Sequence, residues 1–104
     1  MVIEFTKNLY EENIKNNEFV LLYFHAKWCG PCVTLKPIYE NLSNQINNVV
    51  FGKIDVDDLR DISIKYSISA IPTIVLVKNG EPIWHSTGSV SEQFLKDAIE
   101  KNIK

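Results

Sequence analysis

The fold follows from residues 19–32, FVLLYFHAKWCGPC, in which a long apolar run leads into two closely spaced cysteines. The run Phe19–Phe24 is rich in strand-forming side chains, and its continuity is typical of a central strand buried on both faces. Gly30 and Pro31 end this extended segment. From Cys32 onward, apolar side chains recur at helical spacing, so the sequence predicts a strand, a tight turn and a helix.

Segments on both sides of this unit show their own periodicity. Further strands are expected at residues 2–5, 49–56, 73–77 and 83–86, and further helices at residues 6–16, 58–66 and after a capping box at Ser89-Val90-Ser91-Glu92. The last helix should bury Val90, Phe94, Leu95, Ala98 and Ile99. Asn79-Gly80 indicates a hairpin, Pro82 suits an edge strand, and Pro37 should kink the second helix. The order predicts an α/β fold: one domain over residues 1–104, with a central mixed five-stranded sheet flanked by four helices.

The amino-acid composition excludes several classes of function. The 104 residues include 11 lysines and arginines against 13 aspartates and glutamates, a net charge of −2, and 45% are hydrophobic. These values exclude a disordered chain and argue against a nucleic-acid or membrane partner. The start, Met1-Val-Ile-Glu-Phe, has no signal-peptide pattern, so we expect a cytoplasmic location. Nothing in the sequence suggests more than a monomer.

Cys29 and Cys32 are the only cysteines, and their place at the start of a helix has a chemical use. Unpaired N–H groups and the helix dipole favour thiolate over thiol. Thiol–disulfide exchange is the expected reaction: Cys29 attacks a partner's disulfide, and Cys32 then attacks the mixed disulfide. Zinc binding is the alternative, but only His25 and His85 remain as further ligands, and neither has zinc-finger spacing. We therefore expect no metal.

Trp28-Cys29-Gly30-Pro31-Cys32 resembles the active site of the thioredoxin family. The resemblance runs nearly end to end and also includes Phe24, Ala26, Pro37, Lys53, Asp55, Asp57, Ile71-Pro72-Thr73, Lys78-Asn79-Gly80 and Gly88. It implies the thioredoxin fold and the activity of a protein-disulfide reductase, an electron carrier in cell redox homeostasis. No bound cofactor is implied, because the two sulfurs are the redox centre. Client proteins with disulfides and a recharging thioredoxin reductase are the implied partners.

The resemblance also implies a docking site for clients. Ile71-Pro72-Thr73 fits the family's cis-proline loop, which lies against the two sulfurs. The backbone of Ile71 should stay free to bond an extended client segment, as in strand addition. The implied substrate-binding residues are Trp28, Gly30, Pro31, Ile71, Pro72 and Gly88, with Trp28, Ile71, Pro72 and Val33 forming an apolar patch.

Three positions depart from the family pattern. Tyr23 stands where most members have a buried aspartate that helps to take the proton from the inner thiol. His25 replaces a large aromatic residue and should share the strand face of Tyr23, with a hydrogen bond to Asp57 as one reading. Val33 replaces a residue that is often basic. Tyrosine is a poor base at neutral pH, which leaves three candidate acceptors: water, a neutral Lys53, or His25. The residues expected to tune the thiols are thus Tyr23, His25, Lys53 and Asp57.

Other functions remain as alternatives. The three departures favour a thioredoxin-like protein that serves one dedicated partner. A non-enzymatic binding subunit would use the same fold, although retention of both cysteines argues against it. An oxidase or isomerase is disfavoured, because Gly30-Pro31 between the cysteines is typical of the reducing members of the family.

Overall fold

The computed structural model describes all 104 residues. Its nine elements follow the predicted order and are, with their bounds, β1 Val2–Glu4, α1 Lys7–Asn16, β2 Phe19–His25, α2 Gly30–Gln45, β3 Val50–Asp55, α3 Arg60–Lys65, β4 Thr73–Lys78, β5 Glu81–Thr87 and α4 Glu92–Asn102. α2 is one helix through Pro37. None of the four helices has both the length and the apolar character needed to cross a membrane.

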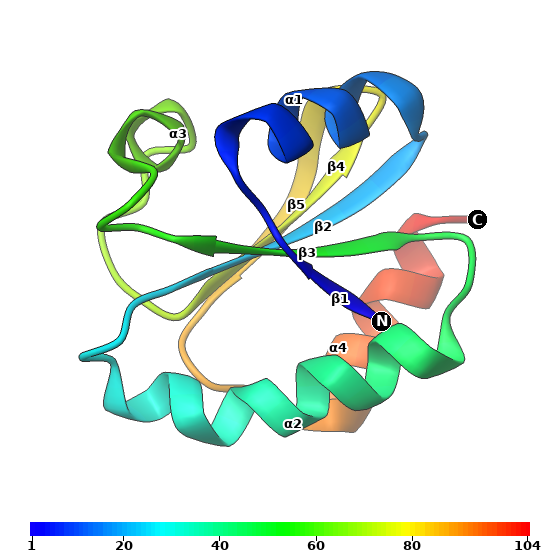
Figure 1. The fold of residues 1–104 in the computed structure, drawn as a ribbon. Helices are drawn as coiled ribbons and strands as arrows, with labels where there is room; N and C mark the ends of the chain where they lie inside the picture. Colours follow the sequence, from blue (N-terminus) through cyan, green and yellow to red (C-terminus); the bar gives the residue numbers. More distant parts are fainter.

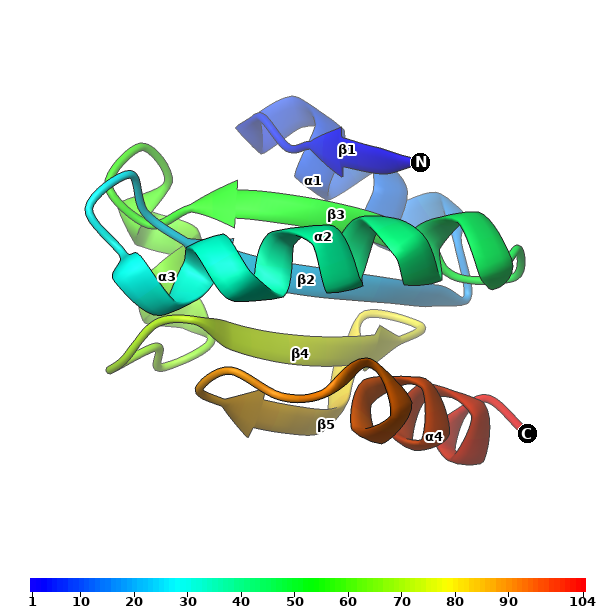
Figure 2. The ribbon, with the colours of Figure 1, turned by 90° about the horizontal axis from the view of Figure 1, so that it is seen from below.

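The five strands form one mixed sheet in the order β1-β3-β2-β4-β5. β3 pairs in parallel with both β1 and β2, whereas β4 is antiparallel to both of its neighbours. Helices α1 and α3 cover one face of the sheet, and α2 and α4 cover the other (Figures 1 and 2). The predicted α/β architecture is confirmed. The parallel arrangement brings the carboxyl ends of β2 and β3 to one edge, where α2 begins.

The continuous apolar run of β2 is explained by burial on both faces. Leu21 and Tyr23 belong to the hydrophobic cluster beneath α2 and α4. Leu22 and Phe24 belong to the cluster beneath α1 and α3. All four are at most 2% exposed. A strand in this position has no solvent-facing side, so its sequence shows no alternation of polar and apolar residues.

The hairpin after β4 forms as predicted. Asn79 and Gly80 have φ values of 50° and 82°, which only residues tolerant of the left-handed region adopt readily. Pro82 lies in β5, an edge strand of the sheet. Proline has no N–H to donate, and an edge strand tolerates this because one of its sides has no partner strand.

Helix α3 begins later than predicted, at Arg60 instead of Asp58. The cause is the carboxylate of Asp55, which accepts a hydrogen bond from the backbone N–H of Asp57 at 2.9 Å and, at 3.4 Å, from that of Asp58. These bonds fold the segment after β3 into a turn, in competition with the first turn of a helix.

The start and the inner face of α4 also differ from expectation. Ser91, not Ser89, caps the helix, since its hydroxyl accepts a hydrogen bond from the Phe94 N–H at 3.1 Å. The prediction of a capping box that pairs Ser89 with Glu92 is therefore wrong. Leu95 and Ile99 are buried as predicted, but Phe94 is 52% exposed and lies beside Trp84, with 6.5 Å between ring centroids.

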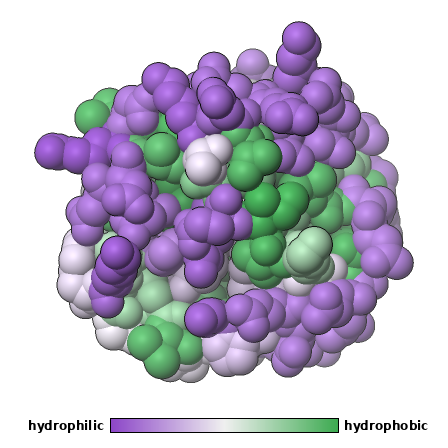
Figure 3. Space-filling view, in the orientation of Figure 1, coloured by the Kyte–Doolittle hydropathy of each residue, from purple (hydrophilic) through white to green (hydrophobic).

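Most of the surface in the orientation of Figure 1 is hydrophilic, with apolar surface concentrated in the middle, over β1 (Figure 3). β1 is an edge strand, and its residues Val2 and Ile3 are only half-buried. The active-site end of the sheet lies away from this central patch, where α2 begins (Figure 1).

Candidate active site

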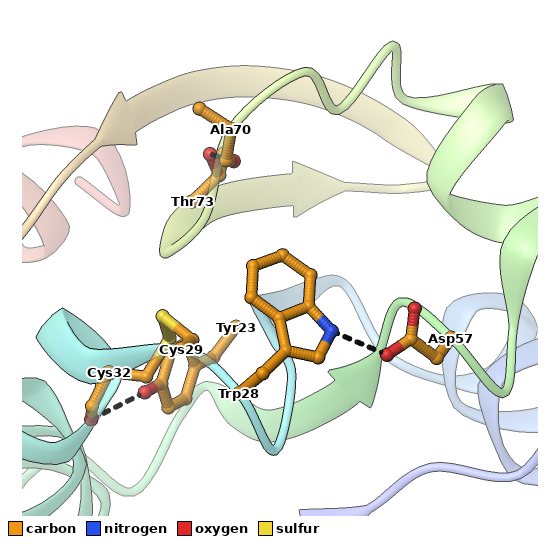
Figure 4. The surroundings of a disulfide bond; sticks show 7 residues. All are labelled: Tyr23, Trp28, Cys29, Cys32, Asp57, Ala70 and Thr73. Carbon is orange, nitrogen blue, oxygen red and sulfur yellow. Dashed lines mark hydrogen bonds between the residues drawn. A yellow bond between two sulfur atoms is a disulfide. The ribbon is translucent and has the colours of Figure 1, made fainter.

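Cys29 and Cys32 form a disulfide bond at the start of α2, with their Cα atoms 5.4 Å apart (Figure 4). Cys29 is the N-cap residue and Cys32 lies in the first helical turn. Both are 6% exposed, so exposure does not distinguish their roles. Chain position does: Cys29 belongs to the loop and faces the unpaired N–H groups of the helix start, whereas Cys32 is fixed within the helix.

Tyr23 lies directly beneath the disulfide. Its hydroxyl donates a hydrogen bond to the backbone carbonyl of Cys32 at 2.9 Å (Figure 4). Burial raises the pKa of Tyr23 to about 12. The phenol is therefore protonated at neutral pH, and its proton is already engaged with the helix backbone. This agrees with the expectation that Tyr23 is a poor base.

His25 occupies the same face of β2, and its ring centroid lies 5.5 Å from that of Tyr23. The expected hydrogen bond to Asp57 is wrong, because Nε2 of His25 is buried without any hydrogen-bond partner. The nearest charged partner in the structure is Glu4, whose Oε2 lies 3.7 Å from Nε2. Burial lowers the pKa of His25, and the positive charge of Lys53 lowers it further, against the opposing carboxylates of Glu4 and Asp55.

Glu4 is the site residue that the sequence analysis missed. Its second oxygen, Oε1, lies 3.4 Å from the ammonium group of Lys53. The neutral-lysine hypothesis required that Lys53 have no carboxylate partner, and Glu4 supplies one. The signal was present in the alternation of β1: parallel pairing with β3 places Glu4 opposite Lys53, on the same face of the sheet as Tyr23 and His25.

Trp28, and not His25, is the hydrogen-bond partner of the Asp57 side chain. The indole Nε1–H donates to Asp57 Oδ2 at 2.8 Å and holds the ring beside the disulfide (Figure 4). The Trp28 side chain is nevertheless 70% exposed, and Val33 in the first turn of α2 is 73% exposed. Together with the exposed Gly30 and Pro31, these residues surround the sulfurs with accessible, uncharged surface.

The Ile71–Pro72 bond is cis, as the resemblance implied. Pro72 itself is buried, so its expected contribution to the apolar patch is wrong; Ile71 is half-exposed. The loop is held by two bonds, from the Gly88 N–H to the Pro72 carbonyl at 2.8 Å and from the Thr73 hydroxyl to the Ala70 carbonyl at 2.7 Å. The N–H and C=O of Ile71 make no backbone hydrogen bond within the protein. Gly88 therefore helps to hold the cis-proline loop in place through its backbone N–H.

Two depressions adjoin this site, one lined in part by Trp28 and the other by both cysteines. One, of about 360 Å³, is lined mainly by apolar side chains, namely Trp28, Val56, Ile68, Ala70 and Ile71, with Ser63 and Ser69. The other, of about 250 Å³, lies behind the disulfide and is lined by Tyr23, His25, Ala26, Lys27, Cys29, Cys32, Val33, Lys36 and Lys53. The second histidine, His85, lies on β5 and lines a separate cavity with Tyr66.

Comparison with known proteins agrees with this geometry. The family model described as Thioredoxin matches residues 1–101. The thioredoxin of Buchnera aphidicola subsp. Acyrthosiphon pisum is 38% identical, over 98% of this chain and 96% of that protein. The solution structure of oxidised thioredoxin from Plasmodium falciparum superposes with a TM-score of 0.89 at 33% identity and covers all of both chains. A structure on the thiol-resolving mechanism of yeast mitochondrial 1-Cys peroxiredoxin contains a chain with a TM-score of 0.85 at 30% identity, covering 96% of this chain and 94% of that one.

Proposed function

The chain belongs to the thioredoxin family, and from that premise we propose that it is a general reductant of protein disulfides in the cytoplasm. It is a thiol–disulfide oxidoreductase, and the Cys29–Cys32 pair is its redox centre. The observation that carries the proposal is this pair at the start of α2, beside the exposed Trp28 and the cis-proline loop. In the reduced protein Cys29 attacks the client disulfide, and Cys32 resolves the mixed disulfide.

Client binding is proposed to use the free backbone of Ile71. An extended client segment would bond to its N–H and C=O, as in strand addition. The neighbouring apolar depression would receive the side chain that precedes or follows the client cysteine, between Trp28 and Ile71. Backbone bonds carry little sequence information, which supports a broad range of clients. Gly30 has open space around its Cα, so close approach of the client to the disulfide meets no side chain there.

The proposed partners follow from the chemistry. Each turnover leaves the Cys29–Cys32 disulfide oxidised, so the electrons must be replaced by a separate reductase of the thioredoxin type. Electrons would then pass from that reductase to this protein, acting as a monomer, and from it to the clients. The yeast structure noted above concerns a 1-Cys peroxiredoxin resolved via glutathione/thioredoxin systems, which supports peroxiredoxins as one class of client. A dithiol reductant also needs a reducing compartment, which supports the cytoplasmic location.

Reduction of insulin, coupled to NADPH and a bacterial thioredoxin reductase, tests the proposal. We expect steady NADPH oxidation and precipitation of the insulin B chain, and sedimentation should give a monomer. A Cys29→Ser variant is the control and should be inactive. The second candidate function, service to one dedicated partner, is favoured by the departures at Tyr23, His25 and Val33. That function predicts very slow reduction of insulin although the reductase still recharges the disulfide.

A further inference from the structure

The proton of the Cys32 thiol needs an acceptor when Cys32 attacks the mixed disulfide, because the thiolate is the nucleophile. Tyr23 fills the strand position beneath the cysteine, but it cannot take this proton. Its hydroxyl donates to the Cys32 carbonyl at 2.9 Å, and burial raises its pKa to about 12. A group other than Tyr23 must therefore serve.

His25 lies where this role needs a titratable group. It lines the same depression of about 250 Å³ as Cys29 and Cys32, a space with room for several water molecules and with polar groups to hold them. Its Nε2 is buried and has no hydrogen-bond partner. Buried polar atoms without partners are rare in folded proteins, so an unpartnered nitrogen in a residue that also lines the cavity of the two cysteines calls for a functional explanation.

The charges around His25 suit a transient proton. Glu4 on β1 and Lys53 and Asp55 on β3 act on the imidazole, and Lys36 on α2 lines the same depression. Burial and Lys53 lower the pKa of His25, so the imidazole is neutral at pH 7 with a lone pair available. Glu4 Oε2, 3.7 Å from Nε2, is close enough that a small movement forms a charge-assisted hydrogen bond once the ring is protonated.

A route to solvent also begins at His25. A second depression, of about 560 Å³, is lined by His25 together with Glu4, Phe5, Thr6, Lys7, Lys27, Lys53, Asp55, Asp58 and Leu59. His25, Lys27 and Lys53 line both depressions. The imidazole thus stands between the cavity that holds the sulfurs and a wider depression lined mostly by polar and charged residues.

We propose that His25 accepts the Cys32 proton through a water molecule in the cavity behind the disulfide, and that Glu4 positions and stabilises the resulting imidazolium. The Cys32 thiolate attacks Cys29 Sγ of the mixed disulfide, the Cys29–Cys32 bond forms, and the client sulfur leaves with the electron pair of the broken bond. The client thiolate takes a proton from solvent, and His25 returns its own to solvent. The inference rests on the disulfide-reductase function proposed above.

The test separates the two exchange steps in single turnover. The reduced protein is mixed with a fluorescent peptide joined by a disulfide to thionitrobenzoate. Attack by Cys29 releases the coloured thiol, and resolution by Cys32 then releases the peptide, which lowers the fluorescence anisotropy. The variants are His25→Phe, which keeps an aromatic ring, His25→Gln, which keeps a polar group, and Glu4→Gln. His85→Phe is the matched control, since it makes the same change at the exposed, remote histidine.

We expect the first step to stay within about twofold of wild type in all variants. Resolution at pH 7 should fall about tenfold or more in both His25 variants, a typical loss for a general base, and less in Glu4→Gln. The wild-type rate should reach its plateau below pH 7, because the pKa of His25 is lowered. The His25 variants should lack that plateau and rise only toward thiol ionisation near pH ~8.5, where they converge with wild type.

Two outcomes would overturn the inference alone. One is resolution in His25→Phe and His25→Gln at the wild-type rate. The other is equal slowing at every pH with an unchanged profile, which indicates a purely structural role. Failure of the wild-type protein to perform the first step would overturn the proposed function and the inference together.

Discussion

The outer rim of the active site and its inner pocket meet at the same disulfide but differ in almost every physical respect. The outer rim consists of Trp28, Val33 and Ile71, which are exposed or half-exposed and carry no charge. The inner pocket consists of Tyr23, His25 and Lys53, which present a buried phenol, a half-buried imidazole and an ammonium group. The exposed Glu4 pairs with Lys53 from outside this pocket. The rim follows the family pattern except at Val33. Two of the three departures from that pattern lie in the pocket.

This difference teaches how the two steps of the reaction are divided. In the proposed binding mode a client touches only the rim, so rim substitutions should change the first, bimolecular step. The pocket sets the protonation of Cys32, so its substitutions should change the second, unimolecular step and its pH dependence. From the pocket side, the Tyr23 hydroxyl donates a hydrogen bond to the backbone carbonyl of Cys32.

The largest effect is expected from Cys32→Ser. Steady-state reduction of a protein disulfide should fall at least about a thousandfold, since serine oxygen is a far weaker nucleophile than thiolate at neutral pH. The first step should survive, because Cys29 remains at the helix start. Mass spectrometry of the stalled reaction should therefore find a stable mixed disulfide between Cys29 and the client.

Cys29→Ser provides the counterpart. It should lose turnover to the same extent but form no mixed disulfide under the same conditions. If Cys29→Ser trapped clients as well as Cys32→Ser does, the assignment of the two cysteines by chain position would be wrong, and the rim and pocket would not correspond to separate steps.

The next effect concerns stability at high pH. Tyrosine in the unfolded chain ionises near pH ~10, whereas folded Tyr23 has a pKa of about 12. The folded state holds its proton longer, so this contribution to stability is complete below pH ~10 and is lost as the pH rises from ~10 through ~12. At pH 11, Tyr23 alone should remove about 1.4 kcal/mol from the free energy of unfolding.

Urea unfolding at pH 9 and pH 11, followed by far-UV circular dichroism, measures this loss against Tyr23→Phe. Burial raises the pKa of Tyr39 as well, and the charge of Tyr23 raises it further, so the difference between the two proteins reports Tyr23 together with its effect on Tyr39. Equal losses in wild type and Tyr23→Phe would mean that the phenol of the pocket is solvated, contrary to its burial.

The sequence allowed prediction of the element order, the cysteine site and the hairpin, because each depends on local patterns. It failed where neighbouring side chains compete to start a helix, and where strands distant in the sequence meet. The carboxylate of Asp55 delayed the start of α3, and a serine two positions further along capped α4. The partner of His25 is Glu4, brought across by the pairing of β1 with β3. The alternation of β1 shows which face Glu4 occupies, but its neighbours on that face depend on pairing with β3, nearly fifty residues further along the chain.

Trp28→Ala tests the rim. We expect kcat/KM for a protein client to fall about fivefold, roughly 1 kcal/mol, because truncation removes a large contact surface from a client interface. Resolution by Cys32 should not change. Phe94→Ala is the matched control, since Phe94 is also a half-exposed aromatic residue (52%) but lies on α4 away from the cysteines. A comparable loss in Phe94→Ala would show that general surface hydrophobicity, and not the rim, binds clients.

The smallest effect is expected from Tyr23→Asp, which restores the carboxylate that most of the family has in the pocket. Resolution should become about threefold faster, because a carboxylate next to Cys32 accepts a proton more directly than an imidazole reached through water. The gain should grow to about tenfold in a His25→Phe background, where the carboxylate has no competitor. Tyr23→Asn is the control for the lost ring contacts with His25 and Tyr39, and should give no gain in either background. If single-turnover release of client is no faster in Tyr23→Asp than in wild type, the tyrosine does not limit resolution, and the contrast between a family-like rim and a divergent pocket has no kinetic consequence.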